Sequence, residues 1–277
     1  MDRAVELGCD TFQIFTRNPR SWSFSKLNQG IVQQFKEKLR QHHIAPVFGH
    51  TSYILNLSSP EETVYSKSVE SLATELRRCC ELGIPYLVTH LGSHLGAGNE
   101  IGLHQVISAI KEALSQADNE VVLLVENAAG SQNAVGSKFE ELRDIINGLD
   151  DPHRVGVCLD TCHCFAASYD LRTREVVEET LKCFDRAVGL RLLKLVHLND
   201  SKAPFGSHID RHEHIGLGMI GEKGFRSILS SPLGRRPLIL ETPVDGKRDD
   251  MENLLKVKEL AGLHLPEDCE SQVFMAF

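Results

Sequence analysis

Seven short runs of apolar and β-branched residues recur along the chain, and amphipathic stretches separate them. The runs are Thr11–Thr16, Pro46–His50, Tyr86–His90, Val121–Asn127, Val155–Thr161, Leu192–Asn199 and Pro237–Thr242. Between them apolar residues return every three or four positions, as at Val69, Leu72 and Leu76, which predicts helices. Nearly continuous apolar strands that alternate with helices are typical of a parallel sheet covered on both faces. The pattern therefore predicts an α/β fold.

Six of the seven predicted strands carry a histidine or a carboxylate at the strand end or within two positions of it. These residues are His50, His90, Glu126, Asp160, His197 and Glu241, with successive members 34 to 44 residues apart. In a closed (β/α)₈ barrel the carboxyl ends of all strands meet at one mouth, where active sites form. An open doubly wound sheet would spread such residues along a crevice. The predicted fold is therefore a (β/α)₈ TIM barrel.

The number of strands in this predicted barrel is one short. The chain begins with a predicted helix, Asp2–Leu7, that leads into the strand at Thr11, so we expect the first barrel strand to be absent or incomplete at the N-terminus. Either the natural chain begins upstream, or the barrel closes in an unusual way. An open seam would expose apolar strand edges and lower solubility or stability. We expect residues 1–277 to form a single TIM-barrel domain.

Composition narrows the class of protein. The chain has 277 residues, of which 42% are hydrophobic and 25% charged, and this balance excludes collagen, coiled coil and disorder. No apolar run approaches the roughly 18 residues that cross a bilayer, and the N-terminus lacks the pattern of a signal peptide. We therefore predict a cytoplasmic protein without membrane contact, whose eight cysteines are thiols. Nothing in the sequence requires a partner subunit, so we expect a monomer.

The net charge bears on nucleic-acid binding. The formal charge is −8, whereas a simple electrostatic binder of nucleic acid is basic. Three divalent cations would add six positive charges and leave a balance of −2, concentrated where a phosphate would dock. Composition therefore leaves nucleic acid open as a partner.

The polar residues at the strand ends predict a metal centre. Glu126, Asp160 and Glu241 would repel one another at one mouth without a cation. Three further candidates follow strand ends at His163, Asp210 and His212. Together they make five histidines and four carboxylates, too many for one catalytic zinc, which takes three protein ligands. Nine ligands divide among three metals with a carboxylate free to bridge two, and nitrogen and oxygen ligands suit zinc, with manganese or iron as alternatives.

Long, chemically unusual motifs cover the chain from residue 11 to about residue 243. They are FTRNPRSW at 15–22, HTSYILNL at 50–57, THLGSHL at 89–95, VENAAG at 125–130, GVCLDTCHCFAASYDLRT at 156–173, VHLNDSK at 196–202, IDRHEHIGLGMIG at 209–221 and LILETP at 238–243. In these motifs the chain resembles the endonuclease IV family of apurinic/apyrimidinic (AP) endonucleases, which are xylose-isomerase-like TIM barrels. The departure from the family lies at the N-terminus, where members begin with a strand and a helix.

The resemblance implies a trinuclear zinc site with no ligand missing. One zinc would take His50, His90 and the bridging Glu126. A second zinc would take Glu126, Asp160, His197 and Glu241. The third zinc would take His163, Asp210 and His212. A zinc-bound hydroxide beside Glu126, the residue we assign as catalytic, would attack the phosphorus in line. The implied reaction hydrolyses double-stranded DNA 5′ to an abasic site, leaving a 3′-hydroxyl and a 5′-deoxyribose phosphate.

The resemblance also implies DNA contacts in the loops at the mouth. Arg17, Arg20 and Trp22 follow the first visible strand, and Tyr53 follows His50. Arginines could hold phosphates, while aromatic side chains could wedge into the base stack beside an extruded nucleotide. The alternative is that Trp22 and Tyr53 pack the loops against the barrel. Lys202 is as readily a solvated lysine as a phosphate contact.

Two other functions remain to be weighed. A sugar isomerase or epimerase of the related barrels would need Glu126, Asp160, His197 and Glu241 for one metal, but it would not need the five further ligands. A non-catalytic barrel that binds only DNA or metal would be expected to have lost ligands, and none is lost. The nine-residue set therefore favours the nuclease.

Overall fold

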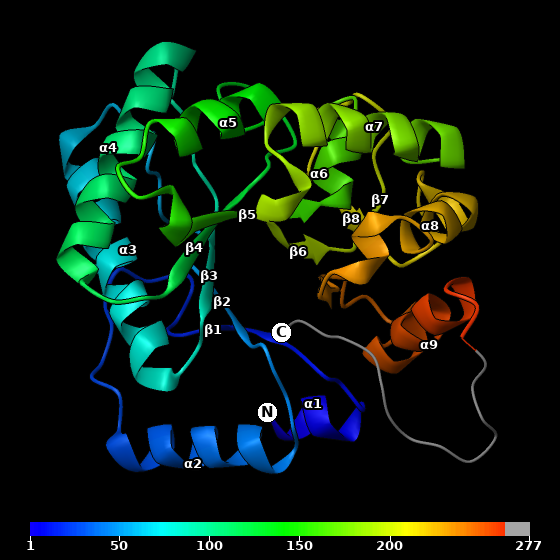
Figure 1. The fold of residues 1–277 in the computed structure, drawn as a ribbon, viewed down its shortest axis with the longest axis horizontal. Helices are drawn as coiled ribbons and strands as arrows, with labels where there is room; N and C mark the ends of the chain where they lie inside the picture. Colours follow the sequence, from blue (N-terminus) through cyan, green and yellow to red (C-terminus); the bar gives the residue numbers. More distant parts are fainter. Residues whose placement is uncertain (264–277) are drawn as a thin grey trace.

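Seven parallel strands form the centre of the molecule in the computed structural model, which describes residues 1–263 (Figure 1). They are β1 (Gln13–Phe15), β2 (Phe48–His50), β3 (Tyr86–Thr89), β4 (Val122–Glu126), β5 (Val155–Asp160), β6 (Leu193–His197) and β9 (Leu238–Ile239). Their spatial order follows the chain order, and each pairs in parallel with the next. This is the strand arrangement of a TIM barrel, as the sequence predicted.

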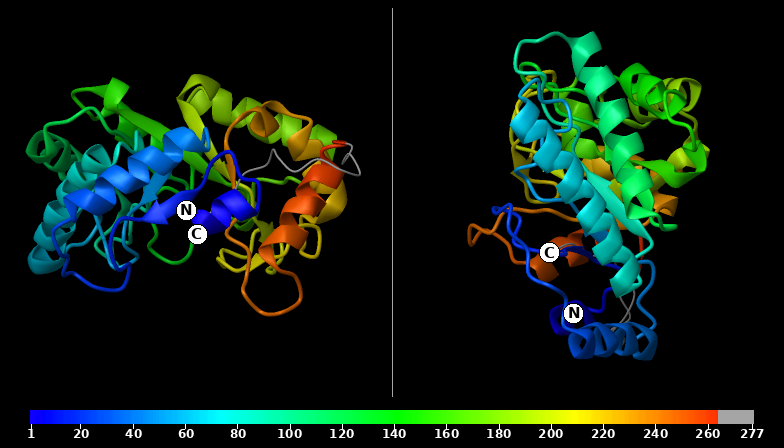
Figure 2. Two further views of the ribbon diagram at one scale, coloured as in Figure 1. Left: turned by 90° about the horizontal axis from the view of Figure 1, so that it is seen from below. Right: turned by 90° about the vertical axis from the view of Figure 1, so that its left-hand side faces the viewer.

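Helices surround these strands on the outside, as the views in Figures 1 and 2 agree. They are α1 (Asp2–Glu6), α2 (Gln29–Gln41), α3 (Glu62–Leu82), α4 (Asn99–Ala117), α5 (Phe139–Asn147), α6 (Thr161–Ala166), α7 (Arg174–Ala187), α8 (Gly221–Leu229) and α9 (Asp250–Leu260). Short 3₁₀ turns lie at Pro152–Arg154, Leu190–Leu192 and Pro232–Arg235. No helix within residues 1–263 combines the length and the apolar character needed to cross a membrane.

Over residues 1–263 the barrel has one strand fewer than the usual eight. Among the described residues β1 and β9 are the two edges of the sheet and do not pair with each other. The expected absence of the first strand is thus confirmed, and the chain enters β1 directly from α1. Ala4 of α1 is fully buried in the core, so this short helix is packed against the barrel.

Local signals in the sequence explain where individual helices begin and end. The side chain of Asn28 accepts hydrogen bonds from the backbone N–H groups of Gly30 and Ile31, which caps the first turn of α2. Asp249 and Glu252 form a reciprocal capping box at the start of α9. Helix α3 ends at Gly83, whose positive φ of 75° favours glycine.

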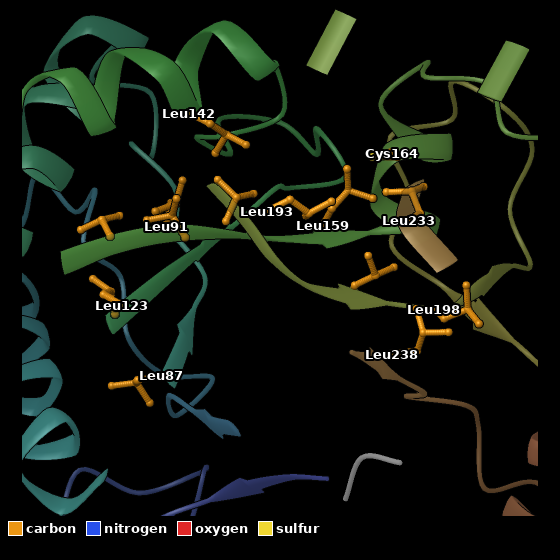
Figure 3. Packing of buried hydrophobic residues seen from close by; sticks show 14 of the residues in the cluster. Leu87, Leu91, Leu123, Leu142, Leu159, Cys164, Leu193, Leu198, Leu233 and Leu238 are labelled. Atoms are coloured by element: carbon orange, nitrogen blue, oxygen red, sulfur yellow. The ribbon is translucent and has the colours of Figure 1, made fainter. Parts of the chain in front are cut away.

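The apolar residues form two layers, one outside the strands and one inside. The outer layer packs between sheet and helices, and Figure 3 shows part of it, including Leu87, Leu123 and Leu193. The inner layer consists of Phe48, Val88, Leu124, Cys158, Leu195 and Ile239. Each inner residue comes two positions before a predicted metal ligand on the same strand or its continuation, and side chains two apart face the same way. The apolar layer is therefore the floor beneath the polar mouth.

A small two-stranded hairpin follows β6 and carries part of the mouth. Strands β7 (Asp200–Ser201) and β8 (His212–Glu213) pair antiparallel. The buried carboxylate of Asp200 accepts hydrogen bonds from the backbone N–H groups of Gly216 and Gly218, both at 2.9 Å. A Cβ at Gly218 would lie 2.5 Å from this carboxylate, so glycine permits the close approach. The glycines here are turn residues wrapped around Asp200.

Candidate metal centre

The residues predicted from the strand ends converge on Glu126 inside the mouth of the barrel. One oxygen of its carboxylate, Oε2, lies 3.4 Å from Nε2 of His50 and 3.1 Å from Nε2 of His90. The other, Oε1, lies 3.2 Å from Nδ1 of His197 and 3.3 Å from Nδ1 of His163. Glu126 is buried and is the point at which the two sides of the centre meet.

Three sets that consist entirely of predicted ligands bring their ligand atoms within 4.8 Å of one another. The sets are His50, His90 and Glu126; Glu126, Asp160, His197 and Glu241; and Asp160, His163 and His212. The first two match the sets that the sequence predicted. In the third, Asp160 stands where Asp210 was expected.

Asp210 nevertheless lies against both histidines of the third set. Its Oδ2 is 3.1 Å from Nε2 of His163, and its Oδ1 is 3.3 Å from Nε2 of His212. The fold thus gathers all nine predicted residues in one place.

Three histidines of the centre are oriented by backbone carbonyl groups. Nδ1 of His50 donates to the oxygen of Thr51 at 2.7 Å, and Nδ1 of His163 donates to the oxygen of Asn127 at 2.9 Å. Nδ1 of His212 donates to the oxygen of Glu241 at 2.9 Å. A carbonyl can only accept, so each Nδ1 carries a proton, and Nε2 is the nitrogen left to face a metal.

His212 provides the clearest test of whether a metal fits. Its Nε2 is buried and has no hydrogen-bond partner among the described residues. An orphaned buried nitrogen beside carboxylates is a metal-ligand geometry, and imidazole and carboxylate donors suit zinc. The residues present therefore fit divalent metal ions.

Asparagines that the sequence did not single out support the carboxylates. Asn199 donates from Nδ2 to Oδ2 of Asp160 at 2.6 Å, and its Oδ1 accepts from the backbone N–H of Glu241 at 2.8 Å. Asn127 accepts from the backbone N–H of Asp160 at 2.7 Å. Both asparagines follow closely after predicted ligands, inside motifs that were recognised, and this position is the signal that could have found them.

Gln13 was also missed, and it contacts two of the predicted ligands. The residue lies on β1, where its side-chain amide hydrogen-bonds to His197 and Glu241. A polar residue inside the apolar run TFQIFT was the only signal in the sequence.

The electrostatics of the centre are those of tightly paired acids and bases. Burial would raise the pKa of Glu126, but His90 and His197 beside it hold that pKa well below its ordinary value. Burial would likewise lower the pKa of His163, but Asp160 and Asp210 raise it well above the usual range. Protons on the histidines therefore balance the carboxylates, and divalent cations would take over this balance.

A cavity of about 500 Å³ opens above the centre. It is lined by His50, His90, His163, Asp210, His212 and Glu241 among others. A neighbouring cavity of about 350 Å³ shares Tyr53, His90, His163 and Asp210 with it. The centre is thus accessible to a ligand from the mouth.

The four predicted DNA contacts lie in different environments. Tyr53 is 58% exposed at the edge of both cavities, its ring centroid 5.0 Å from that of Phe15. Arg20 is exposed in the loop after β1. Trp22 is half-buried and packs against the core.

Arg17 is the buried member of the four. Its side chain is only 2% exposed and forms an ion pair with Glu75. It also donates to Ser71 and to the backbone oxygen of Ser21. In the structure the guanidinium is therefore bonded to protein groups, whereas the sequence predicted a contact with DNA.

Histidines near the predicted ligands have other partners. His214 is buried and bonds to Asp245 through Nε2 at 2.9 Å and to Asn253 through Nδ1 at 2.9 Å. It therefore does not compete with His212, although both belong to one loop.

Comparisons with known proteins agree with this geometry. A family model described as a xylose isomerase-like TIM barrel matches residues 1–261. A "Probable endonuclease 4" of Methanoculleus marisnigri is 54% identical over 262 residues, which cover 94% of this chain and 93% of the relative. Another of Nitrosopumilus maritimus is 48% identical over 264 residues, with 94% of each chain covered. The chain belongs to the endonuclease IV family. The resemblance found in the sequence is confirmed.

A solved structure of the endonuclease IV family has the same fold over nearly the whole chain. Endonuclease IV from Thermus thermophilus superposes with a TM-score of 0.82 at 38% identity, covering 95% of this chain and 91% of that one. A D-tagatose 3-epimerase-like protein, at 19% identity and a TM-score of 0.67, shares the fold alone. As a member of the endonuclease IV family, the protein is an enzyme of DNA repair, a phosphodiester hydrolase of the AP endonuclease class.

Proposed function

We propose that the protein hydrolyses the phosphodiester bond 5′ to abasic sites in double-stranded DNA, leaving a 3′-hydroxyl and a 5′-deoxyribose phosphate. The observation that carries this proposal is the gathering of nine candidate metal ligands at the barrel mouth, with Glu126 among them and in contact with four of the histidines. Three zinc ions are the proposed cofactors, with manganese or iron as alternatives at individual sites. We propose that the active unit is a monomer with one catalytic domain.

The contacts of the side chains support the proposed ligand sets. His50 and His90 face Oε2 of Glu126, which supports a first site. His197 faces Oε1 of Glu126 and lies 3.4 Å from Oε2 of Glu241, which supports a second site that also takes Asp160. His163, Asp210 and His212 would hold the third.

Glu126 is the residue we propose to bridge two metals. Each of its two oxygens faces a different pair of histidines, and the carboxylate is buried, so neither oxygen is lost to solvent. When bound, zinc supplies positive charge to a phosphate and lowers the pKa of a water molecule to about 7. This reaction requires no side-chain nucleophile.

The further groups of the centre hold the ligands in place. Backbone carbonyls fix the rings of His50, His163 and His212. These hydrogen bonds orient the ligand side chains before a metal binds, so fewer side-chain motions have to be frozen when it does. The apolar floor beneath them keeps the centre in a low dielectric, where charges on a phosphate are stabilised more strongly than in water.

The proposed DNA surface consists of Arg20, Tyr53 and Trp22. Arg20 is exposed and can reach a backbone phosphate, and Tyr53 presents its ring over the cavities above the centre. An aromatic ring at this place can occupy the space of a missing base or stack on its neighbour. Trp22 has less free surface, and we propose that it supports the loop and contacts DNA with its exposed part.

The proposal is tested with a duplex that carries one tetrahydrofuran abasic analogue, which does not undergo β-elimination. We expect the zinc-loaded protein to nick this duplex 5′ to the analogue and to leave an undamaged duplex intact. Glu126→Gln should abolish the nick, while Glu140→Gln, a matched change on the exposed side of α5, should retain it. A folded, zinc-loaded protein that leaves the analogue uncut would overturn the proposed function.

A further inference from the structure

Gln13 is a buried polar residue at a level of the barrel where the other strands place apolar residues. It is 1% exposed and pairs in register with Phe48, a member of the inner apolar layer. Burying an amide costs free energy unless its hydrogen bonds are satisfied. The partners of Gln13 therefore decide what it does.

Both ends of the Gln13 amide bond to residues of the metal centre. Its Nε2 lies 3.0 Å from Oε1 of Glu241, and its Oε1 lies 2.9 Å from Nε2 of His197. A carboxylate only accepts, which places the amide nitrogen of Gln13 on the side of Glu241. The amide oxygen then faces His197, so Nε2 of His197 must be the protonated nitrogen.

This contact makes His197 different from three other histidines of the centre. In His50, His163 and His212 a backbone carbonyl accepts from Nδ1, which leaves Nε2 as the nitrogen for a metal, although Nδ1 of His163 also lies 3.3 Å from Oε1 of Glu126. His197 instead turns Nδ1 inward, where it lies 3.2 Å from Oε1 of Glu126 and 3.4 Å from Oε2 of Glu241. A side chain, rather than the backbone, keeps the proton on Nε2 of His197 and leaves Nδ1 as the nitrogen for a metal.

The same amide also links two strands that do not pair. Strands β1 and β9 are the edges of the sheet among the described residues, and Glu241 follows β9 by two positions. The hydrogen bond from Gln13 to Glu241 thus crosses the seam of the barrel and leaves Oε2 of Glu241 facing His197.

We propose that Gln13 is a positioning residue of the second metal site. It holds His197 in the tautomer whose Nδ1 can bind metal, and it orients Glu241 across the seam. This inference rests on the proposed function, because it assigns a role toward the zinc that His197, Glu241 and Glu126 would hold. Side chains that orient a metal-binding histidine typically contribute about 10- to 100-fold to metal affinity.

The test measures zinc bound at buffered free zinc concentrations in the wild type and three variants. Gln13→Met keeps the length of the side chain but removes both hydrogen bonds, and we expect it to weaken the binding of one zinc by about 10-fold or more. Gln13→Glu keeps an acceptor for Nε2–H of His197, and we expect it to bind zinc more tightly than Gln13→Met. Thr11→Val is the matched control, because Thr11 precedes β1 and its hydroxyl bonds to the backbone oxygen of Pro46, away from the centre.

A second readout follows the rings directly. Long-range ¹H–¹⁵N spectra of the zinc-loaded, histidine-labelled protein report which nitrogen of each ring carries the proton. We expect Nε2–H for His197 in the wild type and in Thr11→Val, with the signal lost or the tautomer mixed in Gln13→Met. The ring signals of His50 and His163 should remain unchanged, because backbone carbonyls orient both.

The outcomes separate this inference from the proposed function. If the wild type binds zinc and nicks the abasic analogue while Gln13→Met binds zinc equally well, the role of Gln13 is overturned and the proposed function stands. The role is likewise overturned if Thr11→Val weakens zinc binding as much as Gln13→Met, or if Gln13→Glu is no better than Gln13→Met. A wild type that binds no zinc overturns both.

Discussion

The guanidinium of Arg17 forms a buried ion pair with Glu75, with 3.0 Å between Nε and Oε1. The same carboxylate oxygen accepts from the backbone N–H of Ser52 at 3.2 Å, so Glu75 on α3 holds the loops after β1 and β2 together. Direct contacts complete the link, since the backbone oxygen of Pro19 accepts from the hydroxyl of Ser52 and from the backbone N–H of Tyr53. The pair thus sets the positions of the two loops that carry the proposed DNA contacts.

Breaking this pair from one side should be costly. Glu75→Leu or Arg17→Met alone would leave an uncompensated buried charge, and we expect either to lower the free energy of unfolding by about 3–5 kcal/mol. Burial raises the pKa of Glu75 even though Arg17 opposes this shift, which indicates a large desolvation cost. The double variant should therefore be more stable than either single one. Urea unfolding of the wild type, the two single variants and the double variant completes this double-mutant cycle. Losses of stability in the single variants that add up to the loss in the double variant would contradict the prediction.

Removing the ring of Tyr53 should weaken recognition of the abasic site. We expect Tyr53→Ala to lower the affinity for the abasic analogue about tenfold, since a stacking contact contributes about 1–3 kcal/mol. Tyr53→Phe keeps the ring and should retain most of the affinity. Fluorescence anisotropy with Glu126→Gln as the common background measures binding without cleavage. Equal affinities for Tyr53→Ala and Tyr53→Phe would show that the ring does not contact DNA.

Arg20 should contribute a phosphate contact, which is visible in the salt dependence of binding. Replacing it with alanine removes one cation, so the slope of log affinity against log salt should become shallower by about 1. Arg40→Ala on α2 is the control, since Arg40 is also exposed and pairs with Glu37. A slope that Arg20→Ala leaves unchanged would exclude the contact.

Zinc binding should release protons and strengthen with pH. Burial alone would lower the pKa of His212, but Asp210 and Asp160 raise it to about 9. This pKa lies above the unfolded value of about 6.5, so the proton stabilises the metal-free fold fully below about pH 6.5 and is lost as pH rises through 9. Zinc must displace this proton, so its affinity should rise up to tenfold per pH unit toward pH 9.

Calorimetry in two buffers with different ionisation enthalpies measures this release at pH 7. We expect zinc binding to release at least one proton per protein molecule. An affinity for zinc that is constant from pH 6.5 to 9 would contradict the prediction, and the metal-free protein should become less stable over the same interval.

Asp200 should be essential for the hairpin that carries His212. Asp200→Asn would point an amide N–H₂ at backbone N–H donors, and we expect the free energy of unfolding to fall by about 3 kcal/mol. We also expect the variant to lose one bound zinc. Asp185→Asn is a matched control, because Asp185 is exposed and accepts a single backbone hydrogen bond from Leu190. Thermal unfolding and zinc content check both variants. If Asp200→Asn were as stable as Asp185→Asn, Asp200 would not be essential for the hairpin.

The barrel and most of the centre could be predicted from the chain alone, and the reason is local. Side chains alternate along a strand, so a polar residue at a strand end and an apolar one two positions earlier face the same way, as Glu126 and Leu124 do. Parallel strands then bring their carboxyl ends together. The repeat of His, Asp and Glu at the strand ends therefore predicts where the centre lies. Counting the predicted strands likewise predicts that the first one is missing.

Only the tertiary structure decided which polar groups pair with one another. Arg17 and Arg20 lie three positions apart in one basic loop, yet one is buried against Glu75 and the other is exposed. Gln13 reaches His197 across 184 positions of the chain. Such pairs form only when elements distant in the chain meet, and they leave no periodic pattern in the sequence. The reason is that burying a polar group costs free energy, which only the partner in the closed fold offsets.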